Sequence, residues 1–391
     1  MYLHVYEPTL IKGENKKFIQ YKLFVKNRTE TIFKTYSDFY EFQKLLTYNW
    51  PGIYIPCLPE KLLIDNPNDS LIQKRQKILN NFCLKIAKID YITNSNEFKS
   101  FLKDNNILTN DIYPKIIYSE LLLKYKNNFK NINKNIEEKI DLDKVEEAII
   151  YNKNNINNLL DFQRDVSEVM KEKEIEIKNI TELFEIFTEY ENNILIQYTK
   201  CELTKLIFSN PEHKDISNRI NSLNNDLINP YKELLEWTEN DILDFKSMLN
   251  ALEKFKNFIL LYNNNKIRIS EINKKIIEIK SNKNNNNYLN IFLNCSSTSE
   301  DKLENLIKER ETIENDNKYL LDIINIIHSI NDEFIIKFKK EKMEKYNEQF
   351  KIFIEEDKKN RNIINDLWDC ISNVIKSKNL GKENKEQNIS P

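Results

Sequence analysis

Residues 34–61 read KTYSDFYEFQKLLTYNWPGIYIPCLPEK, and this stretch decides the fold of the N-terminal part of the chain. A Tyr-Ser-Asp-Phe turn leads into an amphipathic helix, for which Ser37 or Asp38 is a suitable N-cap. A loop follows at residues 51–59, and its prolines restrict the conformations of the chain before Lys61. An aromatic ring, a lysine and a stiff loop suit the binding of a phosphorylated headgroup better than they suit catalysis.

Short strands precede this helix. Residues 2–6, 18–25 and 31–36 are rich in aromatic and β-branched side chains and are separated by turn residues, which predicts an antiparallel meander. Apolar residues at helical spacing mark further helices at residues 71–86 and 95–102. The sequence therefore predicts an α+β N-terminal domain, with a three-stranded antiparallel sheet and helices packed on it.

The order of these features resembles the phox-homology (PX) domain, the phosphoinositide-binding module of sorting nexins. The resemblance covers residues 1–104 and rests on YSDF, PGIxIPxLPEK, the arginine of IQKRQKILNNF, and SNEFKSFL, in that order. It implies that Tyr36 supports the inositol ring and that Lys61 contacts phosphate. It also implies that Arg75 binds the ring hydroxyls or a second phosphate.

The chain departs from the PX family at the residue directly before the tyrosine. The family has an arginine there that binds the 3-phosphate, whereas this chain has Thr35, with Lys34 beside it. A hydroxyl makes a neutral hydrogen bond, while arginine makes a bidentate, charge-assisted contact. Two alternatives stay open. The site either binds phosphatidylinositol 3-phosphate, with Lys34 in place of the arginine, or binds weakly, with altered specificity, or to protein.

Two apolar segments are candidates for insertion into a bilayer. The PX resemblance implies that the loop after Lys61 dips into the membrane, although it could instead pack on the domain. The residues concerned are Leu62, Leu63 and Ile64. Residues 105–133 form a linker with a basic amphipathic helix, which suits either the membrane interface or packing against the next domain. Its candidate insertion residues are Ile116, Ile117 and Leu121.

Residues 134–378 predict long amphipathic helices, at about residues 134–205, 215–281 and 300–378, with a kink at Pro230. Such helices bury their apolar stripes in a bundle, and the apolar surface that remains favours a dimer. This outline, and the run INDEFIIKFKKEKMEKYNEQFKIFIEEDKKNRNIINDLW, resemble the BAR domain of PX-BAR sorting nexins. The fold class is therefore a PX domain followed by an all-α, elongated three-helix BAR-type bundle, with a polar, disordered tail at residues 379–391.

Two basic clusters in these helices are candidates for contact with an anionic membrane, where each lysine contributes about 1 kcal/mol. The alternative is a solvated helix face interlaced with glutamates. The cluster in the second helix comprises Lys266, Arg268, Lys274 and Lys275. The cluster in the third helix comprises Lys337, Lys339, Lys340 and Lys342.

The composition argues against several other classes of protein. A net charge of −2 over 391 residues does not favour nucleic-acid binding. The 5 cysteines and 3 histidines show no metal-ligand spacing, so no metal or other cofactor is expected. No paired carboxylates, triad or phosphate loop indicates an enzyme. No apolar run approaches the ~20 residues of a transmembrane helix, so we expect a protein that is cytoplasmic or peripherally bound to a membrane. The PX-BAR resemblance implies that this membrane is endosomal.

The PX-BAR resemblance implies a peripheral membrane adaptor. It would bind phosphoinositide-containing endosomal membranes and sense or induce curvature as a homo- or heterodimer. Its task would be endosomal sorting and endosome-to-Golgi retrieval alongside a retromer-type cargo complex. Because the sequence begins almost at the first predicted strand, we expect it to lack the long N-terminal extension of some relatives. The alternative function is a coiled-coil interaction protein whose PX domain binds protein partners rather than lipid.

Overall fold

The structure is a computed structural model that describes residues 2–12, 17–26, 31–59, 69–103, 116–129, 141–285 and 296–386. Residues 60–68 lie outside the described residues, and with them Lys61, Leu62, Leu63 and Ile64. The chain divides into two compact units. Unit 1 comprises Met1–Asn157 and Ile242–Phe338, and unit 2 comprises Asn158–Asp241 and Lys339–Pro391.

Unit 1 begins with a three-stranded antiparallel sheet in the order β1-β2-β3, which confirms the predicted meander. Its strands are β1 (Leu3–Lys12), β2 (Lys17–Val25) and β3 (Ile32–Thr35). β1 is longer than predicted, because a bulge after Tyr6 lets the strand continue past Glu7, whose φ is 48°.

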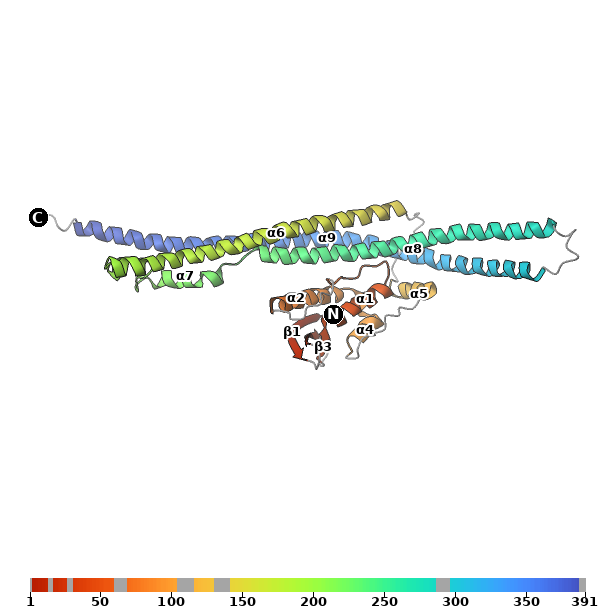
Figure 1. Ribbon diagram of the computed structural model, residues 1–391, viewed down its shortest axis with the longest axis horizontal. Helices are drawn as coiled ribbons and strands as arrows, with labels where there is room; N and C mark the ends of the chain where they lie inside the picture. Colours follow the sequence, from red (N-terminus) through yellow and green to blue (C-terminus); the bar gives the residue numbers. More distant parts are fainter. Residues whose placement is uncertain are drawn as a thin grey trace. The chain divides into compact units, whose positions relative to one another are not determined.

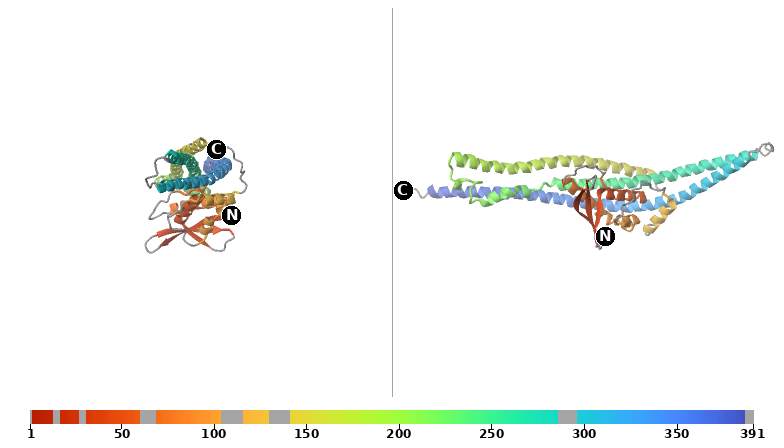
Figure 2. Two further views of the ribbon diagram at one scale, coloured as in Figure 1. Left: turned by 90° about the vertical axis from the view of Figure 1, so that its right-hand side faces the viewer. Right: turned by 60° about the horizontal axis from the view of Figure 1, so that its bottom comes forward.

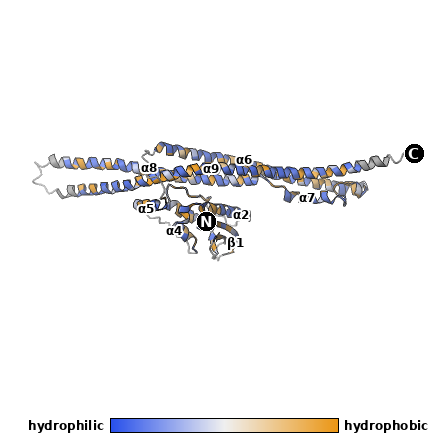
Figure 3. Cartoon of the chain, turned by 180° about the vertical axis from the view of Figure 1, so that it is seen from behind, coloured by the Kyte–Doolittle hydropathy of each residue, from blue (hydrophilic) through white to orange (hydrophobic). Residues whose placement is uncertain are grey.

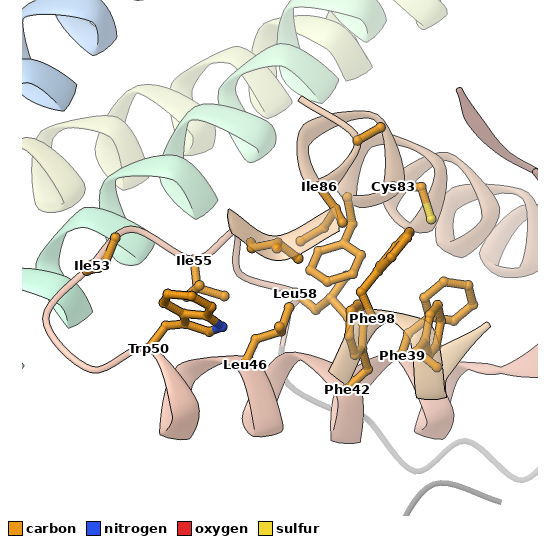
Figure 4. Packing of buried hydrophobic residues seen from close by; sticks show 14 of the residues in the cluster. Phe39, Phe42, Leu46, Trp50, Ile53, Ile55, Leu58, Cys83, Ile86 and Phe98 are labelled. Carbon is orange, nitrogen blue, oxygen red and sulfur yellow. The ribbon is translucent and has the colours of Figure 1, made fainter. Parts of the chain in front are cut away.

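Five helices follow the sheet in the chain. They are α1 (Tyr36–Asn49), α2 (Asp69–Ile86), α3 (Asp90–Thr93), α4 (Asn96–Phe101) and α5 (Tyr118–Asn128). α1 buries Phe39, Phe42 and Leu46, which recur every three or four residues and so lie on one face. Phe42 stacks on Phe101 of α4 with ring centroids 4.2 Å apart, so aromatic packing joins the helices. Figure 4 shows Phe39 and Phe42 of α1 beside Phe98 of α4.

The long helices follow, and they form the predicted BAR-like bundle. They are α6 (Leu142–Tyr190), α7 (Lys214–Asp226), α8 (Tyr231–Asn285) and α9 (Ser296–Glu386). Polar and apolar residues alternate along these helices, as amphipathic packing requires (Figure 3). α6 continues as the π-helix η1 (Glu191–Tyr198), and the 3-10 turn η2 (Leu203–Lys205) comes before α7.

The helix bounds differ from the predicted ones at several places. The first long helix ends at Tyr190, or at Tyr198 with the π-helix η1, and not at residue 205. The predicted second helix is two helices, because residues 227–230 form a connection that ends in Pro230, which has no backbone N–H to donate. α9 continues to Glu386, beyond residue 378. The added segment is rich in lysine and glutamate, which are good helix formers, so only residues 387–391 of the predicted tail lie outside the described residues.

In unit 1, the PX-like fold and the long helices share one hydrophobic core. Phe255, Phe258 and Ile259 of α8 belong to the same buried cluster as the aromatic residues of α1 and α4, and so do five residues of α9. The α9 residues are Leu320, Ile323, Ile324, Ile327 and Ile330. Figure 1 shows α1, α2 and α5 between the sheet and these helices, and the end-on view of Figure 2 shows the same layering.

Unit 2 has its own core, built from α6, α7 and α9. Phe184 of α6 is 1% exposed and packs with Ile216 and Leu223 of α7 and with Leu367 of α9. The chain between α6 and α7 is held by Glu191, whose carboxylate accepts hydrogen bonds from the backbone N–H groups of residues 207, 208 and 209, at 2.7–2.9 Å. A buried carboxylate with this many donors needs no cationic partner.

Candidate functional site

Tyr36 and Arg75 come together where α1, α2 and the end of the proline loop meet. Tyr36 is the first residue of α1, is 8% exposed, and donates its hydroxyl to the carbonyl oxygen of Pro59 at 2.8 Å. The guanidinium carbon of Arg75 on α2 lies 5.1 Å from the centroid of the Tyr36 ring, which is a cation–π contact. Two residues that the PX resemblance assigned to the headgroup site, 39 positions apart in the sequence, are therefore neighbours in the structure.

Burial keeps the phenol groups of this site neutral. It raises the pKa of Tyr36 to about 12, and the positive charge of Arg75 opposes this increase. Tyr21 of β2 behaves in the same way: burial raises its pKa to about 12, and the charge of Arg75 again acts in the opposite direction. At neutral pH the site therefore contains neutral phenol hydroxyls beside the Arg75 guanidinium.

Thr35 has a local role at the start of α1. It is the N-cap of the helix, and it forms a capping box with Asp38. The backbone N–H and the hydroxyl of Thr35 donate to Asp38 Oδ2 at 2.7 and 2.9 Å, and Asp38 N–H donates back to Thr35 Oγ1 at 3.3 Å. The hydroxyl proton that a phosphate oxygen would accept is thus already donated within the protein.

Lys34 lies inside the domain and not beside the Tyr36 ring. It is 4% exposed, its Nζ donates to the carbonyl oxygen of Lys103 at 2.7 Å, and the same atom lies 5.6 Å from the Phe101 ring centroid. Successive residues of a strand point to opposite faces of the sheet, so the neighbours Lys34 and Thr35 diverge. We therefore remove Lys34 from the expected headgroup residues, because it does not replace the missing arginine.

The linker helix α5 packs into unit 1. Leu121 is 7% exposed and belongs to the core cluster, and Tyr125 stacks on Trp50 with ring centroids 5.9 Å apart. Ile116 is partly buried against that cluster, and Ile117 is exposed. The buried apolar side of α5 is not available to a bilayer, so Leu121 is withdrawn as an insertion residue, and the packing alternative for this helix describes the structure.

The proline loop attaches the PX-like fold to the long helices of unit 1. Tyr54 donates its hydroxyl to Asp244 Oδ1 of α8 at 3.0 Å, and Lys85 of α2 forms an ion pair with the same carboxylate at 2.5 Å. Cys57 N–H donates to Ser247 Oγ at 2.8 Å, and the Gly52 carbonyl accepts a hydrogen bond from Asn331 of α9 at 3.1 Å. We call this set of contacts the joint. Its residues are Gly52, Tyr54, Cys57, Lys85, Asp244, Ser247 and Asn331.

The joint is not among the sites expected from the sequence, although a weak signal for it exists. Asp241, Asp244 and Ser247 recur every three residues within the apolar part of α8, where polar side chains need buried partners. This spacing marks a polar stripe on a helix that is otherwise suited to a core. It does not identify the partner elements, which lie far away in the sequence.

The basic cluster of α8 is only partly available. Arg268 is paired with Glu309 of α9 through two guanidinium nitrogens. Lys266 lies 4.5 Å from the centroid of the Tyr262 ring. Lys274 and Lys275 are exposed and form no ion pair with any residue that the structure describes.

The basic cluster of α9 includes one residue with a structural role. Lys342 forms an ion pair with Asp241 at 2.5 Å within unit 2, and the two side chains are only 14% and 9% exposed. It is therefore removed from the expected membrane surface. Lys340 is exposed, 3.9 Å from Glu344, and Lys337 and Lys339 are exposed.

Over the described ranges, no three His, Cys, Asp or Glu side chains are grouped in a way that could hold a metal ion. No described helix is long and apolar enough to cross a membrane.

Comparisons with known proteins agree with this geometry. Residues 23–105 match the family model of the PX domain, which includes Tyr36 and Arg75. A solved chain, from the cryo-EM structure of the SNX-BAR Mvp1 tetramer, aligns over 95% of this chain and 99% of its own length, with a TM-score of 0.60. The chain therefore has a PX domain followed by a BAR-like helical bundle, and its fold is that of an SNX-BAR chain.

The sequence likeness to known PX-BAR proteins is more distant than the likeness of fold. The identity to the Mvp1 chain is 16%, so that match concerns the fold. The vacuolar protein sorting-associated protein vps5 of Schizosaccharomyces pombe is 30% identical over 112 residues. This match covers 26% of this chain and 19% of the length of vps5.

Proposed function

We propose that this PX-BAR protein is a peripheral membrane adaptor that binds phosphoinositide-containing endosomal membranes through its PX domain. The observation that carries the proposal is the contact between Arg75 and the face of Tyr36, beside the end of the proline loop. This pair offers a cation for phosphate and a ring face for the inositol, and Lys61 adds a second cation by the PX resemblance. The phospholipid is phosphatidylinositol 3-phosphate, bound weakly because Thr35 stands where relatives have arginine.

Flotation with vesicles that contain single phosphoinositides tests this proposal. Wild type is compared with Arg75→Ala, with Lys61→Ala and with Thr35→Arg. We expect Arg75→Ala to lower binding by about 10- to 100-fold, since a hydrogen bond to a charged group contributes about 1.5–3 kcal/mol. Thr35→Arg should strengthen it. Arg361→Ala, which removes an exposed arginine of α9 that pairs with Asp357 outside the PX domain, is the matched control, and an equal loss in that variant would contradict a headgroup site at Arg75.

The proposal includes a dimer formed through the BAR domain, with itself or with a related chain. Unit 2 exposes large apolar side chains that a single chain does not cover. Those on α6 are Leu160, Phe162, Val169, Ile175, Leu183, Ile186, Phe187 and Tyr190, and those on α9 are Met343, Tyr346, Phe350, Ile354, Trp368 and Ile375. Patches of this kind favour association. The Mvp1 chain forms a tetramer, so a chain of this fold can self-associate.

Light scattering tests the dimer. The exposed residues Met343, Tyr346, Phe350 and Ile354 recur every three or four residues along α9, so a charge at Ile354 lies within an apolar stripe. We expect Ile354→Glu to shift the protein toward the monomer. Ile336→Glu, at a residue of unit 1 that is 73% exposed, is the control and should leave the mass unchanged. A wild type that is monomeric at all concentrations would oppose the homodimer, and pairing with a second chain would then be tested.

The curvature and sorting roles follow from the same family. A dimer that presents Lys274, Lys275, Lys337 and Lys339 to an anionic surface would sense or induce curvature, since each lysine contributes about 1 kcal/mol. The proposed task is endosomal sorting and endosome-to-Golgi retrieval with a retromer-type cargo complex. The likeness to vps5, a vacuolar protein sorting-associated protein, supports a role in protein sorting. Flotation on vesicles of two sizes tests the first point, because curvature sensing requires tighter binding to the smaller vesicles.

A second candidate function is a coiled-coil interaction protein whose PX domain binds protein. The observation in its favour is that Thr35 and Lys34, the two residues before Tyr36, are both engaged inside the protein. Absence of binding to every phosphoinositide, in a protein that still dimerises, would favour this candidate over the lipid adaptor.

A further inference from the structure

Tyr21 carries a buried hydroxyl that has no hydrogen-bond partner among the residues that the structure describes. Its side chain is 0% exposed in the core of unit 1, and its hydroxyl oxygen forms no hydrogen bond there. Other buried tyrosines of the same unit are bonded: Tyr125 donates to the Pro51 carbonyl at 2.6 Å, and Tyr54 donates to Asp244 at 3.0 Å. An unpaired buried hydroxyl lowers the stability of the fold, so its presence requires an explanation.

The position of Tyr21 in the sheet supplies one. Tyr21 lies opposite Lys34 of β3, two residues before Tyr36, and both Tyr21 and Lys34 are buried on the inner face of the sheet. The inner face is covered by α2, which is fixed to β1 by two hydrogen bonds. The Val5 N–H donates to Asn80 Oδ1 at 3.1 Å, and Gln76 Nε2 donates to the Val5 carbonyl oxygen at 3.3 Å. Arg75 lies on the same helix, directly before Gln76, and its guanidinium packs against the ring of Tyr36.

The strand register places Tyr21 beside the end of β3, which leads directly into Tyr36, and the electrostatics agree with this position. The charge of Arg75 acts on Tyr21 and on Tyr36, and Tyr21 also acts on Tyr36. The Tyr36 hydroxyl has its own acceptor at Pro59, whereas the Tyr21 hydroxyl has none within the described ranges. Of the two neutral donors near Arg75, Tyr21 is therefore the one whose hydrogen bond remains to be made.

We propose that Tyr21 is a further headgroup-binding residue, whose hydroxyl donates a hydrogen bond to an oxygen of the phosphorylated inositol that Arg75 holds against Tyr36. The inference rests on the proposed lipid-binding function and names a donor that partly offsets the arginine missing at position 35. Because the hydroxyl is covered in this structure, the headgroup reaches it only when the side chains around it move, while Arg75 stays in contact with the phosphate. The ligand class is an inositol with a phosphomonoester, either free or on a lipid.

The test compares two buried tyrosines that differ in one respect. Tyr21→Phe removes a hydroxyl without a partner in the described part of the chain, and Tyr125→Phe removes a bonded one; both side chains are 0% exposed. Each full-length variant is titrated with inositol 1,3-bisphosphate and floated with vesicles containing phosphatidylinositol 3-phosphate, and its thermal unfolding is recorded. The soluble probe measures headgroup contacts alone, and the vesicles measure them on a lipid.

We expect Tyr21→Phe to keep or raise the Tm while it weakens the binding of both probes by about five- to tenfold, the loss of one hydrogen bond. Tyr125→Phe should lower the Tm and leave both affinities unchanged. Unchanged binding by Tyr21→Phe, or a Tm that falls as it does for Tyr125→Phe, would overturn the inference while wild-type binding still upheld the lipid function. If wild type binds neither probe, both the inference and the proposed lipid function are wrong.

Discussion

Replacing Asp244 with asparagine tests whether the joint holds the PX domain on α8 and α9. The Asp244 carboxylate is 7% exposed and contacts two groups of the PX domain, the Lys85 ammonium at 2.5 Å and the Tyr54 hydroxyl at 3.0 Å. Asparagine keeps the size of the side chain and removes its charge. The substitution therefore leaves the lysine without this carboxylate and leaves the packing of the loop unchanged.

The expected cost follows from the burial of this ion pair. Removal of one partner from a buried pair destabilises a protein by about 3–5 kcal/mol, because the other charge stays buried without compensation. Lys85 is 22% exposed and gains some solvation, which puts the loss near the lower end, at about 3 kcal/mol. For a domain of this size that corresponds to a fall in Tm of roughly 6–12 °C.

Calorimetry and hydrogen exchange measure the two consequences. Asp244→Asn should lower the first unfolding transition, and the Cys57 N–H, which donates to Ser247 Oγ at 2.8 Å, should exchange faster. Glu253→Gln is the matched control on the same helix, since its ion pair with Lys153 is 44% and 53% exposed and contributes about 1 kcal/mol or less. A Tm within about 1–2 °C of wild type, with normal protection of Cys57, would refute the role of the joint.

Three further predictions follow from single buried contacts. Gly52→Ala should destabilise unit 1 by about 1–3 kcal/mol, because φ is +87° and the new Cβ would lie 2.8 Å from a side-chain carbon of α9. Denaturant titration measures this loss, and a stability equal to wild type would show that the loop relaxes. Glu191→Gln should cost about 2–3 kcal/mol and speed the exchange of the backbone N–H groups it binds, because an amide offers them a single acceptor oxygen; unchanged protection would oppose this role. Burial and the nearby Glu233 raise the pKa of Glu356, so the folded protein binds this proton more tightly than the unfolded chain, and stability falls as pH rises through the folded pKa. Glu356→Gln should therefore raise the Tm at pH 7, with a gain that disappears on acidification below the carboxylate pKa; a lower Tm at pH 7 would contradict the assignment.

The parts of the fold that were predictable depend on local signals. The Tyr-Ser-Asp-Phe turn defines a helix start, although the capping residue is Thr35 and not the expected Ser37 or Asp38. Asp38 takes part as the acidic member of the capping box. Apolar residues that recur every second residue predict the strands, and apolar residues that recur about every 3.6 residues predict the first helices. Both patterns can be recognised within a short stretch of sequence.

The burial of Lys34 and Leu121 could not be predicted in this way. A lysine in a short polar run reads as exposed, yet the strand register turns Lys34 inward to the Lys103 carbonyl, 69 positions later. The apolar side of α5 has the same pattern whether it covers a protein core or a bilayer, so only the presence of Trp50 beneath Tyr125 decides between them. The periodicity of an amphipathic helix shows that one face is buried and does not show against what.

Long-range polar contacts could not be predicted from the sequence for a different reason. Lys85 and Asp244 are 159 positions apart, and each belongs to a helix with many other charges. The sequence offers no means of choosing this pair among the 59 basic and 61 acidic residues of the chain. Such pairs can be identified only in the folded structure, which shows which charged side chains are buried and which lie close to one another.

The proline loop connects the proposed headgroup site to the long helices, so the stiffness of the loop can couple the two. At one end, Tyr54 and Cys57 are bonded to α8, and at the other, the Pro59 carbonyl accepts the Tyr36 hydroxyl. Between Cys57 and Pro59 lies only Leu58, which is buried. A shift of Tyr36 on headgroup binding must therefore act on the anchored residues, since a short segment flanked by prolines cannot absorb it. It follows that variants of the joint such as Asp244→Asn should alter the affinity for the headgroup as well as the stability, whereas Glu253→Gln should alter neither.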